Sequence, residues 1–299
     1  MSDRPLTRTF ISIFFRALGR SRAHRQDIWP GLNINRSSGH VMWYGQPLLT
    51  LQRAAQIIPR GLPMIAVVGS GPSLKHQKIE AIGGDTAILC NGAATLADRI
   101  RPIAVAVEDE RFVFRHHAML VSLRRDIPLL LSPSALRAWA ERDAASLKNR
   151  SVALIDNLEK PVATARRNLS DSKLNTIILR GHQSALSLDP EQGVVITGTV
   201  AFSAFQFALN ACPARILLAG IDLANGNDPR FYEADDIAPS GLSKGLDRIL
   251  SGFSLAHEEA SRNKITLDCA SPVSKLLSIG FNYTNDLRPL HKSGIPLKV

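Results

Sequence analysis

From Met64 onward, short continuous apolar runs alternate with longer amphipathic segments, and this alternation constrains the fold most. The apolar runs are MIAVVG, TAILCNG, IAVAVEDE, IPLLLS, SVALID, NTIILRG, RILLAGIDLA and ITLDCASP. Strands that are buried on both faces read as continuous apolar stretches, and parallel strands are joined by covering helices. The pattern therefore predicts an α/β domain over residues 61–299, with a mainly parallel sheet and helices on both faces.

The segments between these runs predict the covering helices. A helix is expected directly after MIAVVG, and further helices are expected in SALRAWAERD, in TVAFSAFQFALNA and around Leu246 to Arg262. Ligands of such sheets usually bind at the carboxyl ends of the strands, near the point where the strand order reverses. Residues at those ends are the first candidates for function.

Residues 1–60 have a different character and are expected to form a basic N-terminal extension. Ile11, Phe14, Phe15 and Leu18 share one face of a helix, and Arg8, Arg16 and Arg20 are expected to lie mainly away from it. The arginines near the N-terminus are Arg4, Arg8, Arg16, Arg20, Arg22 and Arg25, opposed only by Asp3 and Asp27. Such a helix either lies on an anionic membrane surface through residues 8–25 or packs on the body of the protein. Val41–Tyr44 is expected to form a strand or hairpin arm.

Charge and cysteine content restrict the class of protein. The 299-residue chain carries a net charge of +10, which favours anionic partners. No nucleic-acid-binding motif accompanies the charge, so no specific nucleic acid is expected as a partner. No apolar run approaches the ~20 residues of a membrane span. Cys90, Cys212 and Cys269 have no paired spacing and are expected to be buried thiols. These features predict a cytoplasmic protein, which the basic helix would place at the inner face of the cytoplasmic membrane.

A glycine-rich turn follows the first strand. It comprises Gly69, Ser70, Gly71, Pro72 and Ser73. The glycines let a phosphate or another backbone approach, Pro72 suits the first position of a helix, and a serine can cap it. A helix start of this kind binds anions through its free N–H groups. The alternative is a purely structural tight turn.

Polar residues also follow the next strands. Asn91-Gly92 comes after the second strand, where the Asn amide can contact a ribose hydroxyl or a pyrimidine, unless it only forms a turn. Glu108-Asp109-Glu110 follows the third strand. These carboxylates can bind magnesium, orient a sugar hydroxyl or act as a base, or they form a solvated loop.

Three more motifs fall at predicted strand ends or helix starts. Thr197-Gly198-Thr199 opens the helix near Val200 and is a second potential anion site. Asp222 ends the strand RILLAGID and either contacts a ligand or caps a turn. Ser271-Pro272 follows ITLDCA and is expected to start the next helix. Together these motifs predict a nucleotide-sized site.

The stretches GSGPSLK, LCNG, ITGTVAFSAFQFAL, ILLAGIDLANG and CASPVSKL occur in this order. They resemble the bacterial surface-glycan sialyltransferases of the Campylobacter and Haemophilus type. They also resemble a wider group related to the archaeal 6-hydroxymethylpterin diphosphokinase (MptE-like). The resemblance covers about residues 64–280. It implies a Rossmann-like domain that binds a CMP-linked acidic sugar at the Gly69–Ser73 turn, Asn91, Thr197–Thr199 and Ser271-Pro272.

Some positions depart from the sialyltransferase pattern. Leu242 stands where the family has its catalytic His, and Val195 stands where it has an Arg. Ala224 replaces one of its two phosphate-binding tyrosines, and Tyr232 could be the other. The catalytic base must therefore be sought elsewhere, and His182, Glu108 and Asp109 are the candidates, with His257 expected to be structural.

The first functional hypothesis is a glycosyltransferase that moves a sugar from a CMP-activated donor, sialic acid-like or Kdo-like, to a cell-surface glycan or glycolipid. It requires no cofactor and no metal site. The alternatives are a magnesium-dependent diphosphotransferase of the wider group, with Glu108, Asp109 and Asp222 as metal ligands, or a nucleotide-binding member without catalysis.

Overall fold

A computed structural model describes residues 4–19, 22–223, 230–233 and 242–289. The main sheet has eight strands in the order β13-β12-β11-β4-β5-β6-β7-β8, and all neighbouring pairs are parallel. The strands are β4 (Ile65–Val68), β5 (Ala87–Cys90), β6 (Ala104–Val107), β7 (Leu129–Leu131), β8 (Val152–Leu154), β11 (Arg215–Ala219), β12 (Thr266–Cys269) and β13 (Asn282–Tyr283). The predicted parallel sheet is confirmed.

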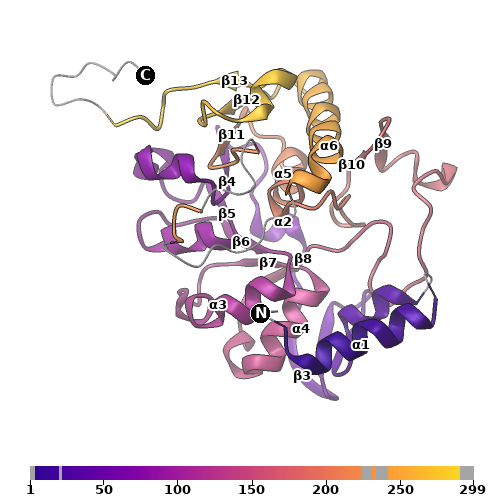
Figure 1. The fold of residues 1–299 in the computed structure, drawn as a ribbon. Coiled ribbons are helices and arrows are strands. Elements are labelled where there is room, and N and C mark those ends of the chain that lie inside the picture. Colours follow the sequence, from indigo (N-terminus) through magenta and orange to yellow (C-terminus); the bar gives the residue numbers. More distant parts are fainter. Residues whose placement is uncertain (1–3, 20–21, 224–229, 234–241, 290–299) are drawn as a thin grey trace.

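Helices cover both faces of this sheet, as the alternating segments predicted (Figure 1). The α-helices are α1 (Leu6–Ala17), α2 (Ala54–Ile57), α3 (Glu110–Ser122), α4 (Pro133–Asp143), α5 (Val200–Asn210) and α6 (Leu242–Arg262). Short 3-10 helices make the remaining turns: η1 (Ala23–Asp27), η2 (Pro72–His76), η3 (Ile79–Ile82), η4 (Asn91–Asp98), η5 (Ala144–Leu147), η6 (Ser172–Leu174) and η7 (Lys275–Ile279).

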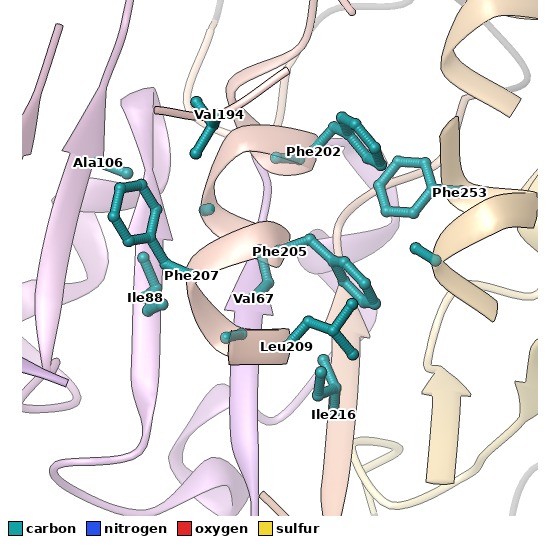
Figure 2. Close-up of a cluster of buried hydrophobic side chains, with 14 of the residues drawn as sticks. Val67, Ile88, Ala106, Val194, Phe202, Phe205, Phe207, Leu209, Ile216 and Phe253 are labelled. Carbon is teal, nitrogen blue, oxygen red and sulfur yellow. The ribbon is translucent and has the colours of Figure 1, made fainter. Parts of the chain in front are cut away.

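Successive residues of each strand contribute to two separate cores. Ile65 and Val67 face α5 and α6, whereas Ala66 and Val68 face α3, α4 and the N-terminal extension. This division follows from the two-residue side-chain period of a strand. Helix α5 is buried on all sides because α6 covers its outer face, where Phe253 packs edge-on against Phe202 and Phe205 (Figure 2).

Two small antiparallel sheets accompany the main one. Strands β1 (Leu32–Ile34), β2 (His40–Trp43) and β3 (Gln46–Thr50) form a meander, which confirms the strand expected at Val41–Tyr44. Strands β9 (Ile178–Arg180) and β10 (Ala185–Ser187) form a hairpin, so the NTIILRG run forms a strand outside the parallel sheet. In Figure 1 the main sheet runs from β13 at the top to β8 below, with α1 near its lower end.

Three sequence expectations are wrong in detail. No α-helix follows β4, because the connection to β5 consists of the 3-10 helices η2 and η3. The helix after β12 begins at Lys275 with Ser274 as its cap, not at Ser271-Pro272. Cys90 and Cys269 are buried thiols, but Cys212 is exposed at the end of α5. Among the described residues no helix is long and apolar enough to cross a membrane.

Candidate functional site

The strand order reverses between β4 and β11. From β4 the chain adds β5, β6, β7 and β8 on one side, and it then returns to add β11, β12 and β13 on the other. The six strands β6-β5-β4-β11-β12-β13 reproduce the 3-2-1-4-5-6 order of a Rossmann fold, whose ligands bind at the carboxyl ends beside the reversal. Most of the motifs singled out in the sequence lie at these ends.

The turn after β4 packs tightly on the end of β11. A Cβ on Gly69 would lie 2.4 Å from the carbonyl oxygen of Gly220, and one on Gly71 would lie 2.4 Å from Oδ2 of Asp222. The carboxylate of Asp222 accepts a hydrogen bond of 2.9 Å from the backbone N–H of Ser73 and another of 2.6 Å from its hydroxyl. The glycines therefore admit a neighbouring backbone and carboxylate.

This arrangement changes the interpretation of Gly69–Ser73. Because η2 has five residues, it lacks the aligned dipole of a full α-helix. The N–H of Ser73 is already bound by Asp222, so the turn does not offer the free helix start that its sequence predicted. Its contribution to a site comes from Ser70, whose carbonyl accepts a 3.2 Å hydrogen bond from the N–H of Phe231 and so holds residues 230–233 over the turn.

At the end of β5, Asn91 adopts a left-handed conformation with φ of 48°. Its Oδ1 is buried and has no hydrogen-bond partner among the described residues. Gly92 lies directly under the ring of Tyr232, because a Cβ there would be 1.8 Å from a ring carbon. The ring of Tyr232 also packs edge-on against His116 of α3, with centroids 5.7 Å apart. Tyr232 therefore covers the end of β5.

The start of α5 offers a second group of donors. Thr199 caps the helix by accepting from the N–H of Ala201, and Gly198 has φ of 109°, a conformation that favours glycine. The hydroxyl of the fully buried Thr197 has no partner in the described part of the chain. Arg248 of α6 donates from Nε to the carbonyl of Thr197 at 2.9 Å, and its Nη2 lies beside Gly198. An exposed cation thus stands at an α-helix N-terminus, where anions bind.

Glu108 joins the end of β6 to this helix start. Its Oε2 accepts a 2.6 Å hydrogen bond from the hydroxyl of Ser203 in the first turn of α5. Burial raises the pKa of Glu108, the hydrogen bond from Ser203 opposes this rise, and the charge of Asp109 adds to it. The residue keeps partial exposure, so a carboxylate with elevated proton affinity remains accessible at the carboxyl edge.

The other predicted carboxylate of this stretch has a structural role. Asp109 caps α3 by accepting from the N–H of Arg111 at 2.9 Å. It also forms an ion pair of 2.6 Å with the Arg111 side chain. Both interactions hold the Asp109 carboxylate at the helix start, so Glu108 is the better placed base.

Several buried polar atoms have no partner among the described residues, and three of them lie after strands of the main sheet or at the start of α5. They are Oδ1 of Asn91, Oγ1 of Thr197 and Oγ of Ser271. Buried polar groups are nearly always hydrogen-bonded, and an unsatisfied one costs about 1–3 kcal/mol. Strands β5 and β12, which carry Asn91 and Ser271 at their ends, lie three strand spacings apart, roughly 14 Å. A ligand that satisfied all three atoms would have the length of a nucleotide sugar.

His182, a predicted base, and His257, expected to be structural, lie on other elements. His182 is exposed in the turn of the β9–β10 hairpin, whose Gly181 packs against Leu255 of α6. Leu255 lies about two helical turns beyond Arg248 on α6. His257 packs against Gly280 and Phe281. Pro272 is exposed beside the buried Ser271.

The carboxylates proposed for magnesium do not converge. Glu108 is bound to Ser203, Asp109 to Arg111 and Asp222 to Ser73. Among the described residues no group of three His, Cys, Asp or Glu side chains could hold a metal ion. Within the described residues, the three carboxylates named for the diphosphotransferase alternative therefore do not form the cluster of oxygen ligands that magnesium needs.

Sequence reasoning missed Arg248, His116 and Ser203. Arg248 and His116 lie in the middle of helices that carry no motif, and Ser203 lies among apolar residues of α5. Their relation to the site depends on helix packing, which brings α6 beside the start of α5 and α3 beside Tyr232. Leu242 opens α6, but its side chain and residue Ala224 lie outside the described part of the structure.

Comparison with known proteins gives three findings. No family model matches the chain. A relative from Salmonella typhimurium, described as a probable 3-deoxy-manno-octulosonic acid transferase, is 24% identical over 206 residues, which is 64% of this chain and 76% of the relative. Among solved structures, the sialyltransferase CstII from Campylobacter jejuni, in complex with a substrate analogue, cytidine-5'-monophosphate, aligns with a TM-score of 0.43 and 14% identity. The alignment covers 77% of this chain and 88% of that one.

Proposed function

We propose that this protein is a glycosyltransferase that takes an acidic sugar of the Kdo or sialic acid class from its CMP-activated form. The observation that carries the proposal is the hydrogen bond between Glu108 and Ser203, which fixes an accessible carboxylate of raised pKa at the start of α5. The unpartnered atoms of Asn91 and Ser271 lie just after β5 and β12, and that of Thr197 lies just before α5. The name of the Salmonella relative favours a Kdo-like donor.

In the proposed reaction an acceptor hydroxyl attacks the anomeric carbon of the donor. A new glycosidic C–O bond forms, the bond between that carbon and the phosphate oxygen breaks, and CMP leaves with the electron pair. Glu108 takes the proton of the hydroxyl. Its raised pKa makes it a stronger base than an ordinary carboxylate, and the hydrogen bond from Ser203 favours the ionised form that catalysis needs.

The start of α5 and Arg248 would stabilise the departing phosphate. Negative charge grows on the phosphate as the bond breaks, and fixed N–H dipoles with a nearby cation are most effective where charge develops. Asn91 and Ser271 would hold the nucleotide through their unpartnered oxygen atoms. Tyr232 would cover the ligand from the segment that Ser70 holds in place.

A substitution at Glu108 tests the assignment of the base. Glu108→Gln keeps the shape and removes the proton acceptor, so we expect transfer from CMP-Kdo or CMP-sialic acid to fall by ~100-fold or more, while CMP still raises the melting temperature. Asp109→Asn is the matched control, because an Asn can still cap α3, and it should retain activity. Because the pKa of Glu108 is raised, we also expect activity to be lost on acidification at a higher pH than the pKa of an ordinary Glu would give.

The outcomes separate the hypotheses. Stabilisation by ATP with magnesium, but not by CMP, would overturn the proposal in favour of a diphosphotransferase. CMP binding without turnover of any CMP-sugar would identify a binding protein that lacks catalysis. Equal activity of Glu108→Gln and the wild type would remove Glu108 as the base.

A further inference from the structure

Helix α1 turns its apolar side outward. Leu6 and Phe10 are 79% and 70% exposed, and Ile13 and Phe14 are each more than half exposed. Leu18, just beyond the helix, is also exposed. These five residues form the outer face of α1. Single exposed apolar residues are ordinary, but five on adjacent turns form a contiguous patch of the kind that marks an interaction site.

The orientation of α1 is fixed by polar contacts on its other side. The buried Arg8 donates to the carbonyls of Trp29 and Gln26, both at 2.7 Å, and pairs with Glu110 at 3.4 Å. Phe15 packs edge-on against Trp29. The sequence predicted that Arg8 lies away from the face that carries Phe15, but both residues are buried, and Arg8 anchors the helix to the body. The outer face therefore cannot turn inward without breaking a buried ion pair.

The charges around the outer face favour an anionic partner. Arg16, Arg22 and Arg25 are exposed in the same N-terminal unit. Within residues 4–19 and 22–31 the only carboxylate is Asp27, and burial raises its pKa to about 6. A second copy of this chain would bring three arginines toward three others, whereas acidic headgroups would neutralise them. A helix of 12 residues is too short to span a bilayer.

We infer that α1 lies in the headgroup region of an anionic membrane, with its outer face inserted among the lipids and Arg16, Arg22 and Arg25 on lipid phosphates. Amphipathic helices bind in this way through apolar burial and electrostatic attraction together. Trp29, half exposed beside Phe15, is of the residue type that favours the same interface.

This docking would bring the membrane to the candidate site. Glu110 forms ion pairs with both Arg4 and Arg8. It is the first residue of α3 and lies two residues after Glu108. Helix α1 is thus anchored at the carboxyl edge of the sheet, where the proposed reaction takes place. This step alone rests on the proposed function: a lipid-linked acceptor would reach Glu108 without leaving the membrane surface.

Co-sedimentation with vesicles tests the inference on the full chain. The chain should bind vesicles of three parts phosphatidylcholine and one part phosphatidylglycerol, and pure phosphatidylcholine vesicles should bind it much less. Phe10→Ser with Ile13→Ser should weaken binding by ~10-fold or more, since both side chains lose their apolar burial. Arg16→Gln with Arg22→Gln should weaken binding to the anionic vesicles and reduce its dependence on salt.

Tyr283→Ser is the matched control, because Tyr283 is an exposed aromatic residue on β13 at the other edge of the sheet. It should bind vesicles like the wild type. Because the substituted residues are exposed, all variants should keep the wild-type melting temperature and its shift with CMP, which separates this test from the test of the proposed function. Equal vesicle binding by the Phe10/Ile13 variant and the wild type would overturn the inference. So would a dimer that this variant converts to a monomer without lipid.

Discussion

Three consecutive carboxylates at the end of β6 have three different partners. Glu108 is bound to Ser203 beside the start of α5, Asp109 caps α3, and Glu110 is buried among Arg4, Arg8 and Arg137. The sequence shows them as one acidic group. Only the environment of each side chain separates a candidate base, a helix cap and an anchor for α1, because burial and neighbouring charges set what a carboxylate can do.

Glycines at the site have equally distinct roles, which two substitutions can separate. In Gly71→Ala the new methyl group would meet the Asp222 carboxylate and the Gly220 backbone, which cannot easily move. We expect a loss of ~1–3 kcal/mol in the free energy of unfolding. In Gly92→Ala the atoms nearest to the methyl group would belong to the ring of Tyr232, a side chain that can rotate away.

Gly92→Ala should therefore keep the wild-type melting temperature but lose much of the stabilisation by CMP, because Tyr232 no longer covers the end of β5. Thermal unfolding with and without CMP measures both effects. A destabilised Gly92→Ala protein with intact CMP binding would contradict this role of Tyr232.

At the scale of elements, the N-terminal helices α1 and η1 bring ionisable groups into a protected region. Asp27 of η1 lies near Glu110, Arg8 and Arg137, and it lines a cavity of about 310 Å³ with His24 and Lys160. Burial, followed by the negative charge of Glu110, raises the pKa of Asp27 from its usual 3.8 to about 6. This region should therefore respond to pH.

The raised pKa of Asp27 determines how stability changes with pH. The folded protein holds the Asp27 proton more tightly than the unfolded chain, so its stability contribution is full below about pH 4 and is lost as pH rises through about 6. Asp27→Asn removes this dependence. At pH 8 the substitution should raise the melting temperature and increase the free energy of unfolding by at most about 3 kcal/mol. At pH 4 both quantities should change little. A difference between the two proteins that is the same at both pH values would exclude this effect.

At the scale of the whole molecule, the N-terminal extension completes one of the two cores. Leu32, Ile34, Val41 and Leu48 of the β1–β3 meander are buried in the same cluster as the strand residues that face α3 and α4. Beyond the meander, Gln52 donates its N–H to the carbonyl of Val152 at 2.8 Å, which covers the edge strand β8. The extension is therefore part of the packing of the sheet.

Deletion of residues 1–60 should accordingly cause aggregation or a loss of cooperative unfolding, because it uncovers apolar surface and an edge strand. Deletion of residues 1–19 is the control, since it removes α1 and leaves the meander in place. Circular dichroism melts and light scattering compare the two proteins. A soluble 61–299 fragment with a wild-type melting temperature would show that the extension contributes little to the core.

The sequence alone predicts the parallel sheet, the covering helices α4, α5 and α6, and the location of most candidate residues at strand ends or helix starts. Local patterns carry this information: apolar runs identify buried strands, and small polar residues mark their ends. The sequence could not decide that Asp222 would bind Ser73, 149 residues away along the chain, or that Arg248 would reach Thr197. It also did not predict that Arg8 would be buried on the same side of α1 as Phe15. These contacts depend on the tertiary structure, because the partner of a charged or polar side chain depends on which distant element packs against it.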